Sequence, residues 1–285
     1  MSELNGSIAS RSTFDSEETG SRASLYSASF WGLWLRDWHV LMGSAATFAI
    51  RTVMQPLLFI FVFAYVFPMI GQDVGVAGDA SFATVLVPGL VAVAVLFQGI
   101  SAVALPLVNE FSVSREIEDR VMAPLPTTAV ALEKLLFGAF QGVIAACIVF
   151  PLLYIVPATD VEVRIGSWPL LIVMLLLSTI TAGAAGLAIG TTFKPTQVPL
   201  VFSVIVIPTT FLGCVYYPWQ ALGAIPWLQV VVLVNPLVYV SEGLRAALTP
   251  QLPHLVPWVS IGALTVATAV LGAIGVRGFH NRVLD

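Results

Sequence analysis

Long uncharged apolar stretches recur along the chain. About 20 residues of helix cross the ~30 Å hydrocarbon layer of a membrane, and six stretches reach roughly that length. We predict spans over residues 53–70, 84–108, 135–156, 168–190, 198–217 and 258–276. Apolar and polar residues do not alternate within them, as they would in barrel strands, so the backbone groups must be paired within helices. The pattern predicts an all-α integral membrane protein with six transmembrane helices.

The fifth uncharged run is too long for one span, and three prolines interrupt its second half. Because proline breaks or kinks a helix, we expect a re-entrant pair of short helices over residues 218–248, before the last span. Asn235-Pro236 is placed at the turn between them, since proline suits the first position of a helix. Glu242 and Arg245 follow three residues apart and are expected to pair.

The positive charges favour one orientation of these spans. With six spans and a cytoplasmic amino terminus, only Arg164 and Arg245 fall outside. The other ten lie inside or at the inner boundary: Arg11, Arg22, Arg36, Arg51, Arg115, Arg120, Lys134, Lys194, Arg277 and Arg282. This split agrees with the positive-inside rule. We therefore expect both termini to be cytoplasmic.

The residues before the first span divide into two parts. Residues 1–24 are rich in serine and have no apolar run, which predicts a disordered cytoplasmic tail. The remainder, 25–285, is predicted to be a single transmembrane domain. Within Phe30–Met42, apolar residues recur at helical spacing, which predicts an amphipathic helix lying on the inner membrane surface. Its apolar face is formed by Trp31, Trp34, Leu35 and Trp38. Alternatively, this segment simply begins the first span.

The densest charge cluster lies in the predicted cytoplasmic loop 110–126, between the second and third spans. An apolar stripe runs through it at helical spacing, and prolines end it. A solvated helix face would explain the charges alone. The stripe favours a docking surface for a cytoplasmic partner, formed by Glu110, Arg115, Glu116, Ile117, Glu118, Asp119 and Arg120.

Composition excludes several classes of protein. Of the 285 residues, 58% are hydrophobic and 10% are charged, whereas a soluble domain carries about 25% charged residues. A water-soluble enzyme is therefore excluded. The net charge of -4 argues against a nucleic-acid partner. Two cysteines are too few for a disulfide framework or a thiolate metal site, and the three histidines show no metal-ligand spacing, so we expect no metal.

A search for catalytic and nucleotide-binding motifs finds none. Neither of the two lysines, Lys134 and Lys194, lies in a phosphate-cradling loop of the G-x-x-x-x-G-K-[S/T] type, so any ATP must be bound by another chain. The span centres also lack charged residues, and internal repeats are not evident, which argues against secondary transporters. Candidate residues along a substrate path are Phe61, Tyr65, Phe97, Gln98, Thr209 and Thr210. The two threonines alternatively satisfy helix carbonyls freed by a neighbouring proline.

Four stretches resemble the ABC type-2 permease family, the membrane subunits of bacterial exporters. They are Leu86–Leu90 with its Pro-Gly-Leu, the charged loop Arg115–Thr127, the fifth span Gln197–Pro218, and Asn235–Arg245, "NPLVYVSEGLR". The drug-resistance and nodulation-factor-type branch is the most similar. One departure is Glu133-Lys134, where the family commonly has Gly-Lys.

The resemblance implies a permease that exports amphipathic, lipid-like or drug-like molecules across a bacterial inner membrane. It implies two partner ATPase subunits, which hold ATP and Mg, and a second permease copy or paralogue; no cofactor is expected in this chain. The loop 110–126 would couple to the ATPase, and the re-entrant helices would form an outer gate at Asn235, Pro236, Tyr239, Glu242 and Arg245. The alternatives are an ATPase-independent secondary transporter or channel, and a membrane enzyme.

Overall fold

The computed structural model of the chain describes residues 26–70, 81–110 and 126–284. The predicted tail 1–24, most of the loop 110–126 and most of the segment between the first two spans lie outside the described residues. The predictions made for Arg115–Arg120 therefore stay predictions.

The described chain is helical, and no strand occurs in those residues. The first half of the described chain begins with a helix over residues 26–43. It continues with α2 (Ala45–Ile60), the π-helical turn η1 (Phe61–Val66), α3 (Phe67–Met69), α4 (Phe82–Asn109), α6 (Thr127–Ile155) and α7 (Trp168–Thr192). The second half comprises η3 (Pro195–Gln197), α8 (Val198–Val201), the π-helical turn η4 (Phe202–Val206), α9 (Ile207–Phe211), η5 (Trp219–Ala224), α10 (Pro226–Val231), η6 (Val232–Val234), α11 (Pro236–Leu248) and α12 (Pro257–Leu284).

Five described helices are long and apolar enough to cross a membrane, and a sixth span arises if one bent pair counts as a span. That pair is Pro226–Val234 with Pro236–Leu248, bent by 99° at Asn235. The bend lies at the predicted turn, within the segment predicted to be re-entrant. These observations confirm the all-α integral membrane fold.

The predicted fifth span, 198–217, was too long. The apolar helix runs over Pro195–Phe211, and the chain leaves it at Gly213. Cys214 has a φ of 52°, a left-handed conformation that a helix cannot contain. Ser241 donates from Oγ to the Gly213 carbonyl over 2.5 Å, so the backbone that leaves the helix is satisfied by α11.

Three other helices extend beyond their predicted limits. The first span begins at Ala45 rather than residue 53, α6 begins at Thr127 rather than residue 135, and α12 continues to Leu284 rather than residue 276. The predicted spans were ended near charged residues. A helix can continue past a charged residue when that residue is paired with another part of the protein or lies at the membrane boundary. Arg51 and Lys134 therefore lie within helices that cross the membrane.

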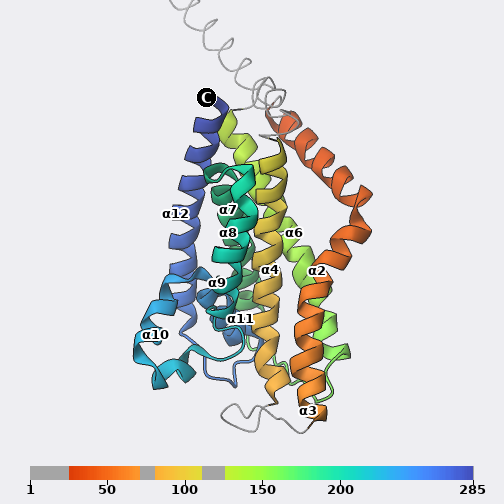
Figure 1. The fold of residues 1–285 in the computed structure, drawn as a ribbon, viewed down its shortest axis with the longest axis vertical. Helices are drawn as coiled ribbons and strands as arrows, with labels where there is room; N and C mark the ends of the chain where they lie inside the picture. Colours follow the sequence, from red (N-terminus) through yellow and green to blue (C-terminus); the bar gives the residue numbers. More distant parts are fainter. Residues whose placement is uncertain (1–25, 71–80, 111–125, 285) are drawn as a thin grey trace, which may run out of the picture.

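α4 forms the centre of the bundle, with α6, α7 and α11 packed around it (Figure 1). Of its most apolar 18-residue window, 78% is buried, against 24% for the first span and 17% for α12. Small residues permit these close contacts. A Cβ built on Gly186 of α7 would lie 2.7 Å from the Ile100 carbonyl oxygen, and one on Gly190 would lie 3.2 Å from Ala104 Cα. These glycines therefore pack within one subunit.

Figure 1 also shows that the molecule has two distinct ends. Helix 26–43 and the end of α12 lie at one end, together with the start of α6; we call it the Lys134 end. The opposite end carries α3, α10 and the loops before α12, and we call it the α11 end.

Gly89, in the first third of α4, is predicted to be the least tolerant of a side chain among the described glycines. A Cβ there would overlap the backbone carbonyl of Val215, which cannot move without disturbing the turn at Cys214. We expect Gly89→Ala to lower stability by about 1–3 kcal/mol, measured as a lower thermal unfolding midpoint in detergent. Gly272→Ala is the control, because nothing lies within 4 Å of its Cβ position. Equal midpoints for the two variants would contradict this packing.

Candidate functional site

The turn before α11 is built from its amino-terminal cap. The Asn235 side chain accepts a hydrogen bond from the Leu237 backbone N–H over 2.9 Å, and Pro236 occupies the first helical position, where a missing N–H costs nothing. The Asn235 amide also donates to the Thr209 carbonyl over 2.8 Å. The same side chain therefore starts α11 and holds it to the end of α9.

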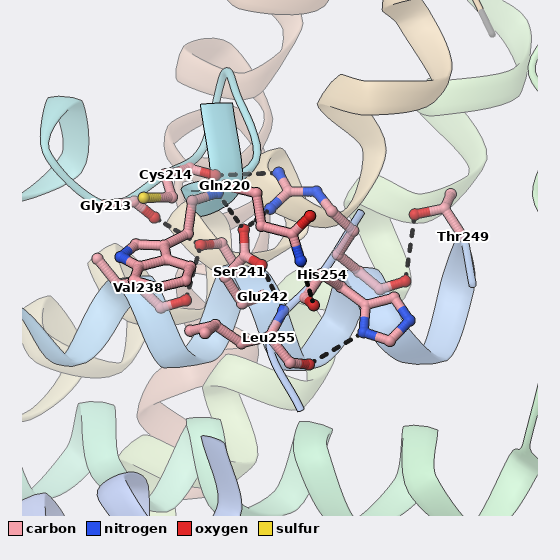
Figure 2. A network of polar contacts seen from close by, with 11 residues as sticks. Gly213, Cys214, Gln220, Val238, Ser241, Glu242, Thr249, His254 and Leu255 are labelled. Atoms are coloured by element: carbon pink, nitrogen blue, oxygen red, sulfur yellow. Dashed lines mark hydrogen bonds and ion pairs between the residues drawn. The ribbon is translucent and has the colours of Figure 1, made fainter. Parts of the chain in front are cut away.

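Glu242 and Arg245 form a completely buried ion pair one turn apart on α11. The predicted pairing is confirmed. Glu242 also accepts hydrogen bonds from the backbone N–H groups of Trp219 (2.9 Å) and Leu255 (2.8 Å). Arg245 donates from Nη2 to the Cys214 carbonyl over 3.0 Å. Figure 2 shows these groups converging from the α11 helix, the turn at Cys214 and the segment before α12.

This α11 network, defined by Ser241, Glu242 and Arg245, holds the turn at Cys214, the start of η5 at Trp219 and the segment before α12 at Leu255. Removing two charges from water costs several kcal/mol per ion, and such a pair is weak evidence for added stability. What the pair determines is geometry, because its bonds reach the backbone at Cys214, Trp219 and Leu255 at once. Irregular backbone at membrane depth requires such internal partners.

The segment before α7 closes the same end of the molecule. The backbone N–H groups of Arg164 and Gly166 donate to the carbonyls of Leu248 (3.0 Å) and Ala247 (3.1 Å). These carbonyls belong to the last turn of α11 and have no partner within the helix. The segment before α7 is therefore held to the last turn of α11.

A second buried charge cluster lies at the Lys134 end. The Lys134 ammonium contacts Asp37 Oδ2 at 2.7 Å and Glu110 Oε1 at 3.0 Å, and its side chain is 6% exposed. Asp37 lies on helix 26–43, Glu110 follows α4, and Lys134 lies on α6. One ammonium group therefore joins three elements, including the first residue of the predicted coupling loop.

Aromatic contacts reinforce this attachment of helix 26–43. The Trp34 ring lies 5.2 Å from that of Phe137 and 5.7 Å from that of Phe140, and the Trp38 ring lies 5.8 Å from Phe140. Trp31 is 59% exposed. Two of the predicted interfacial tryptophans therefore face α6, while Trp31 and Leu35 face outward.

A polar chain of three side chains lies deeper in the bundle. Thr52 of α2 donates to Gln98 Oε1 over 3.2 Å, and Gln98 of α4 donates to Gln141 Oε1 of α6 over 3.2 Å. All three are buried. Buried polar groups are costly unless paired, so these hydrogen bonds fix the relative positions of α2, α4 and α6.

A cavity of about 510 Å³ lies between the Lys134 cluster and these three side chains; apolar side chains line it together with charged and polar ones, for which we call it the polar cavity. Its wall includes Gln98 and Gln141 at one side, Lys134 and Glu110 at another, and Arg51 from α2. A second hollow of about 550 Å³ adjoins it and is largely apolar; its lining includes Phe97 and Arg51.

The predicted substrate-path residues do not gather in one place. Gln98 and Phe97 line the hollows just described. Phe61 and Tyr65 stack on each other with ring centroids 5.5 Å apart, nearer the α11 end.

The two predicted threonines turn to their own helix. Thr209 donates to the Ile205 carbonyl and Thr210 to the Ile207 carbonyl, each over 2.6 Å. Both hydroxyls therefore bond to carbonyls of their own helix, as the alternative interpretation predicted. Tyr239, predicted at the gate, donates from its hydroxyl to the Leu233 carbonyl over 2.8 Å and so braces the bent pair.

Sequence reasoning missed Lys134, Asp37 and Arg51. Lys134 entered only the count of positive charges, the search for a phosphate-cradling loop and the comparison with the family's Gly-Lys, Arg51 entered only the count, and Asp37 was not singled out. A usable signal was present, because lysine occurs only twice in the chain and Lys134 directly precedes an uncharged run.

These observations define a class of protein. In its described residues the chain is a helical membrane protein with a buried ion pair at the α11 end, a buried charge cluster at the Lys134 end, and a cavity beside that cluster. The sequence profile of the family described as ABC-2 type transporter matches residues 28–249. The chain belongs to this family, and it is the membrane subunit of a transporter.

Curated relatives agree with this assignment. The chain is 26% identical over 224 residues to the inner membrane transport permease YadH of Escherichia coli strain K12, which covers 78% of this chain and 83% of the relative. The protein of the same name from Shigella flexneri matches to the same extent.

Proposed function

We infer that this chain is the membrane-spanning permease subunit of an ABC exporter in a bacterial inner membrane. Its substrate would be an amphipathic, lipid-like or drug-like molecule, moved outward by ATP hydrolysis in a separate ATPase subunit. Membership of the ABC-2 type transporter family over residues 28–249 carries this inference. The name of the Escherichia coli relative, an inner membrane transport permease, supports the location.

Two ATPase subunits would supply the energy and hold ATP and Mg, because no phosphate-cradling loop occurs in this sequence. They would dock on the coupling loop 110–126. The loop begins at Glu110, which contacts Lys134, and Lys134 contacts Asp37 of helix 26–43. A force on the loop would therefore pass through buried ion pairs to helix 26–43 and α6.

A second permease copy or paralogue would complete the path. Apolar side chains remain exposed along α2 and along the helix from α8 to α9, among them Met54 and Leu58 on α2 and Val204 and Ile207 on the other. Such faces suit lipid or another helix. The positive-inside rule would place the Lys134 end, and both termini, in the cytoplasm, and the α11 end would then be the outer gate.

Charge reversal in the coupling loop tests this function. We expect the triple variant Glu116→Lys, Glu118→Lys, Asp119→Lys to reduce ATP-driven transport in reconstituted vesicles by about tenfold or more, because charge complementarity sets docking. Hydrolysis by the ATPase would continue without coupling. Asp160→Lys is the control, because Asp160 is an exposed residue at the opposite end.

Two results would overturn the proposal. One is normal transport by the triple variant with its ATPase. The other is substrate movement by the chain alone, with no ATPase present, which would favour a secondary transporter or channel.

A further inference from the structure

Arg51 is a cation inside the first span. It lies two turns into α2, within the candidate span Ala45–Met69, and its side chain is exposed. An ionisable residue in a membrane helix is costly and usually marks a functional site or a pair. Lys134 and Arg245 each contact carboxylates. Within the described residues, Arg51 makes neither a hydrogen bond nor an ion pair.

Arg51 lies where the two hollows meet. It lines the polar cavity of about 510 Å³ together with Ser44 and Gln98, and it lines the apolar hollow of about 550 Å³ together with Met54 and Leu58. The exposed fractions of Met54 and Leu58 are 49% and 55%, so the apolar hollow opens to the side of the bundle. A polar chamber and a lateral apolar groove therefore adjoin at one guanidinium group.

The two carboxylates that line the cavity, Asp37 and Glu110, are paired with Lys134, so the part of the lining around Arg51 fits an oxyanion. A guanidinium binds the oxygens of a phosphate through two parallel hydrogen bonds and stays charged. The hydroxyl of Thr47 lines the same cavity and can donate to a further oxygen, whereas the hydroxyl of Ser44 already donates to the Val40 carbonyl over 3.1 Å. An acyl chain attached to that phosphate would leave the polar chamber along the groove beside Phe97.

We propose that Arg51 binds the phosphate of an anionic phospholipid-type molecule, whose acyl chain lies against Met54, Leu58 and Phe97. This assigns a phosphate-bearing amphipathic lipid as the substrate class and rests on the proposed function. The site lies at the Lys134 end, beside the cluster that the coupling loop would move, so the lipid occupies the position from which transport begins.

Lipid binding to the purified full chain tests the site directly. The protein is placed in phosphatidylcholine nanodiscs and titrated with phosphatidylglycerol, and bound lipid is counted by native mass spectrometry. We expect Arg51→Gln to weaken phosphatidylglycerol binding by about tenfold or more, and Arg51→Lys to weaken it less. Arg277→Gln is the matched control. Arg277 is an exposed arginine near the carboxyl end of α12, at the Lys134 end of the molecule, and it lines neither hollow.

A second variant tests the groove with Arg51 intact. Leu58→Trp narrows the apolar hollow and should weaken phosphatidylglycerol binding about tenfold without changing the binding of inorganic phosphate. It also keeps the proposal testable if Arg51→Gln does not fold, which the thermal midpoint reports.

Several outcomes would overturn the proposal. Equal losses in Arg51→Gln and Arg277→Gln would mean that arginines merely touch surrounding lipid. Equal binding of phosphatidylcholine would exclude a role for the negative charge, and inorganic phosphate displacing the lipid at similar concentration would exclude the groove. The proposed function is measured separately, as ATP-driven transport with the ATPase. Normal ATP-driven transport with no lipid binding at Arg51 would contradict the lipid site and leave the proposed function standing.

Discussion

Replacing Arg245 with methionine is expected to cost about 3–5 kcal/mol of stability, because it leaves the Glu242 carboxylate buried without its cation. Both side chains of the pair are fully buried. Glu242 would still accept hydrogen bonds from Trp219 and Leu255, but the Cys214 carbonyl would lose the donor on Arg245. The thermal unfolding midpoint of the purified protein and its level in the membrane both report the loss.

The matched control is the exposed pair on the loop before α7. Arg164 Nη2 lies 3.9 Å from Glu162 Oε2, with side chains 76% and 69% exposed. Arg164→Met should therefore change stability by about 0–1 kcal/mol. The double variant Glu242→Gln with Arg245→Met should recover part of the loss, since no buried charge remains. Arg245→Met behaving like Arg164→Met would contradict the buried pair.

Replacing Lys134 with methionine is expected to release helix 26–43 from the bundle. Asp37 and Glu110 would then hold two carboxylates near one point with no ammonium between them, and like charges repel strongly where water is scarce. We expect a loss of about 3–5 kcal/mol, seen as a lower thermal midpoint. Hydrogen exchange in residues 26–43 should rise by about tenfold or more, in proportion to the local stability lost.

The chain supplies its own control for this variant. Lys194 is the other lysine, and it is exposed, so Lys194→Met should leave both measurements unchanged. The triple variant Lys134→Met, Asp37→Asn, Glu110→Gln removes all three charges and should restore the attachment through Trp34 and Trp38. Unchanged hydrogen exchange in Lys134→Met would show that the aromatic contacts alone hold helix 26–43.

Hydropathy predicted five of the six spans as helices long enough to cross a membrane, in the right order, while the predicted fifth span is the shorter helix Pro195–Phe211, because apolar length decides which segments can cross. The ends were less predictable. The fifth helix stops at Phe211 because α11 satisfies the backbone of the following turn, which depends on residues about thirty positions later. The π-helical turns η1 and η4 could not be predicted from the spacing of apolar residues. Each lies within a run in which nearly every residue is apolar, so no polar face marks the change in helical register.

The candidate sites divide in the same way. Glu242 and Arg245 were predicted to pair because both lie on one helix at a spacing of three. The Lys134 cluster joins residues separated by 97 and 24 positions, so local spacing carries no information about it. The hollows beside Arg51 are formed by helices distant in sequence, and only their packing reveals them.

The uneven covering of the helices determines how the surrounding bilayer acts on this protein. α4 is enclosed by its neighbours, whereas the first span and α12 are mostly uncovered. The uncharged part of α12, Trp258–Val276, is about 28 Å long at the helical rise, close to the thickness of the hydrocarbon layer. Hydrophobic mismatch is relieved by tilting or by local deformation of lipid. Changes in membrane thickness will therefore tilt α12 and the first span while α4 keeps its position.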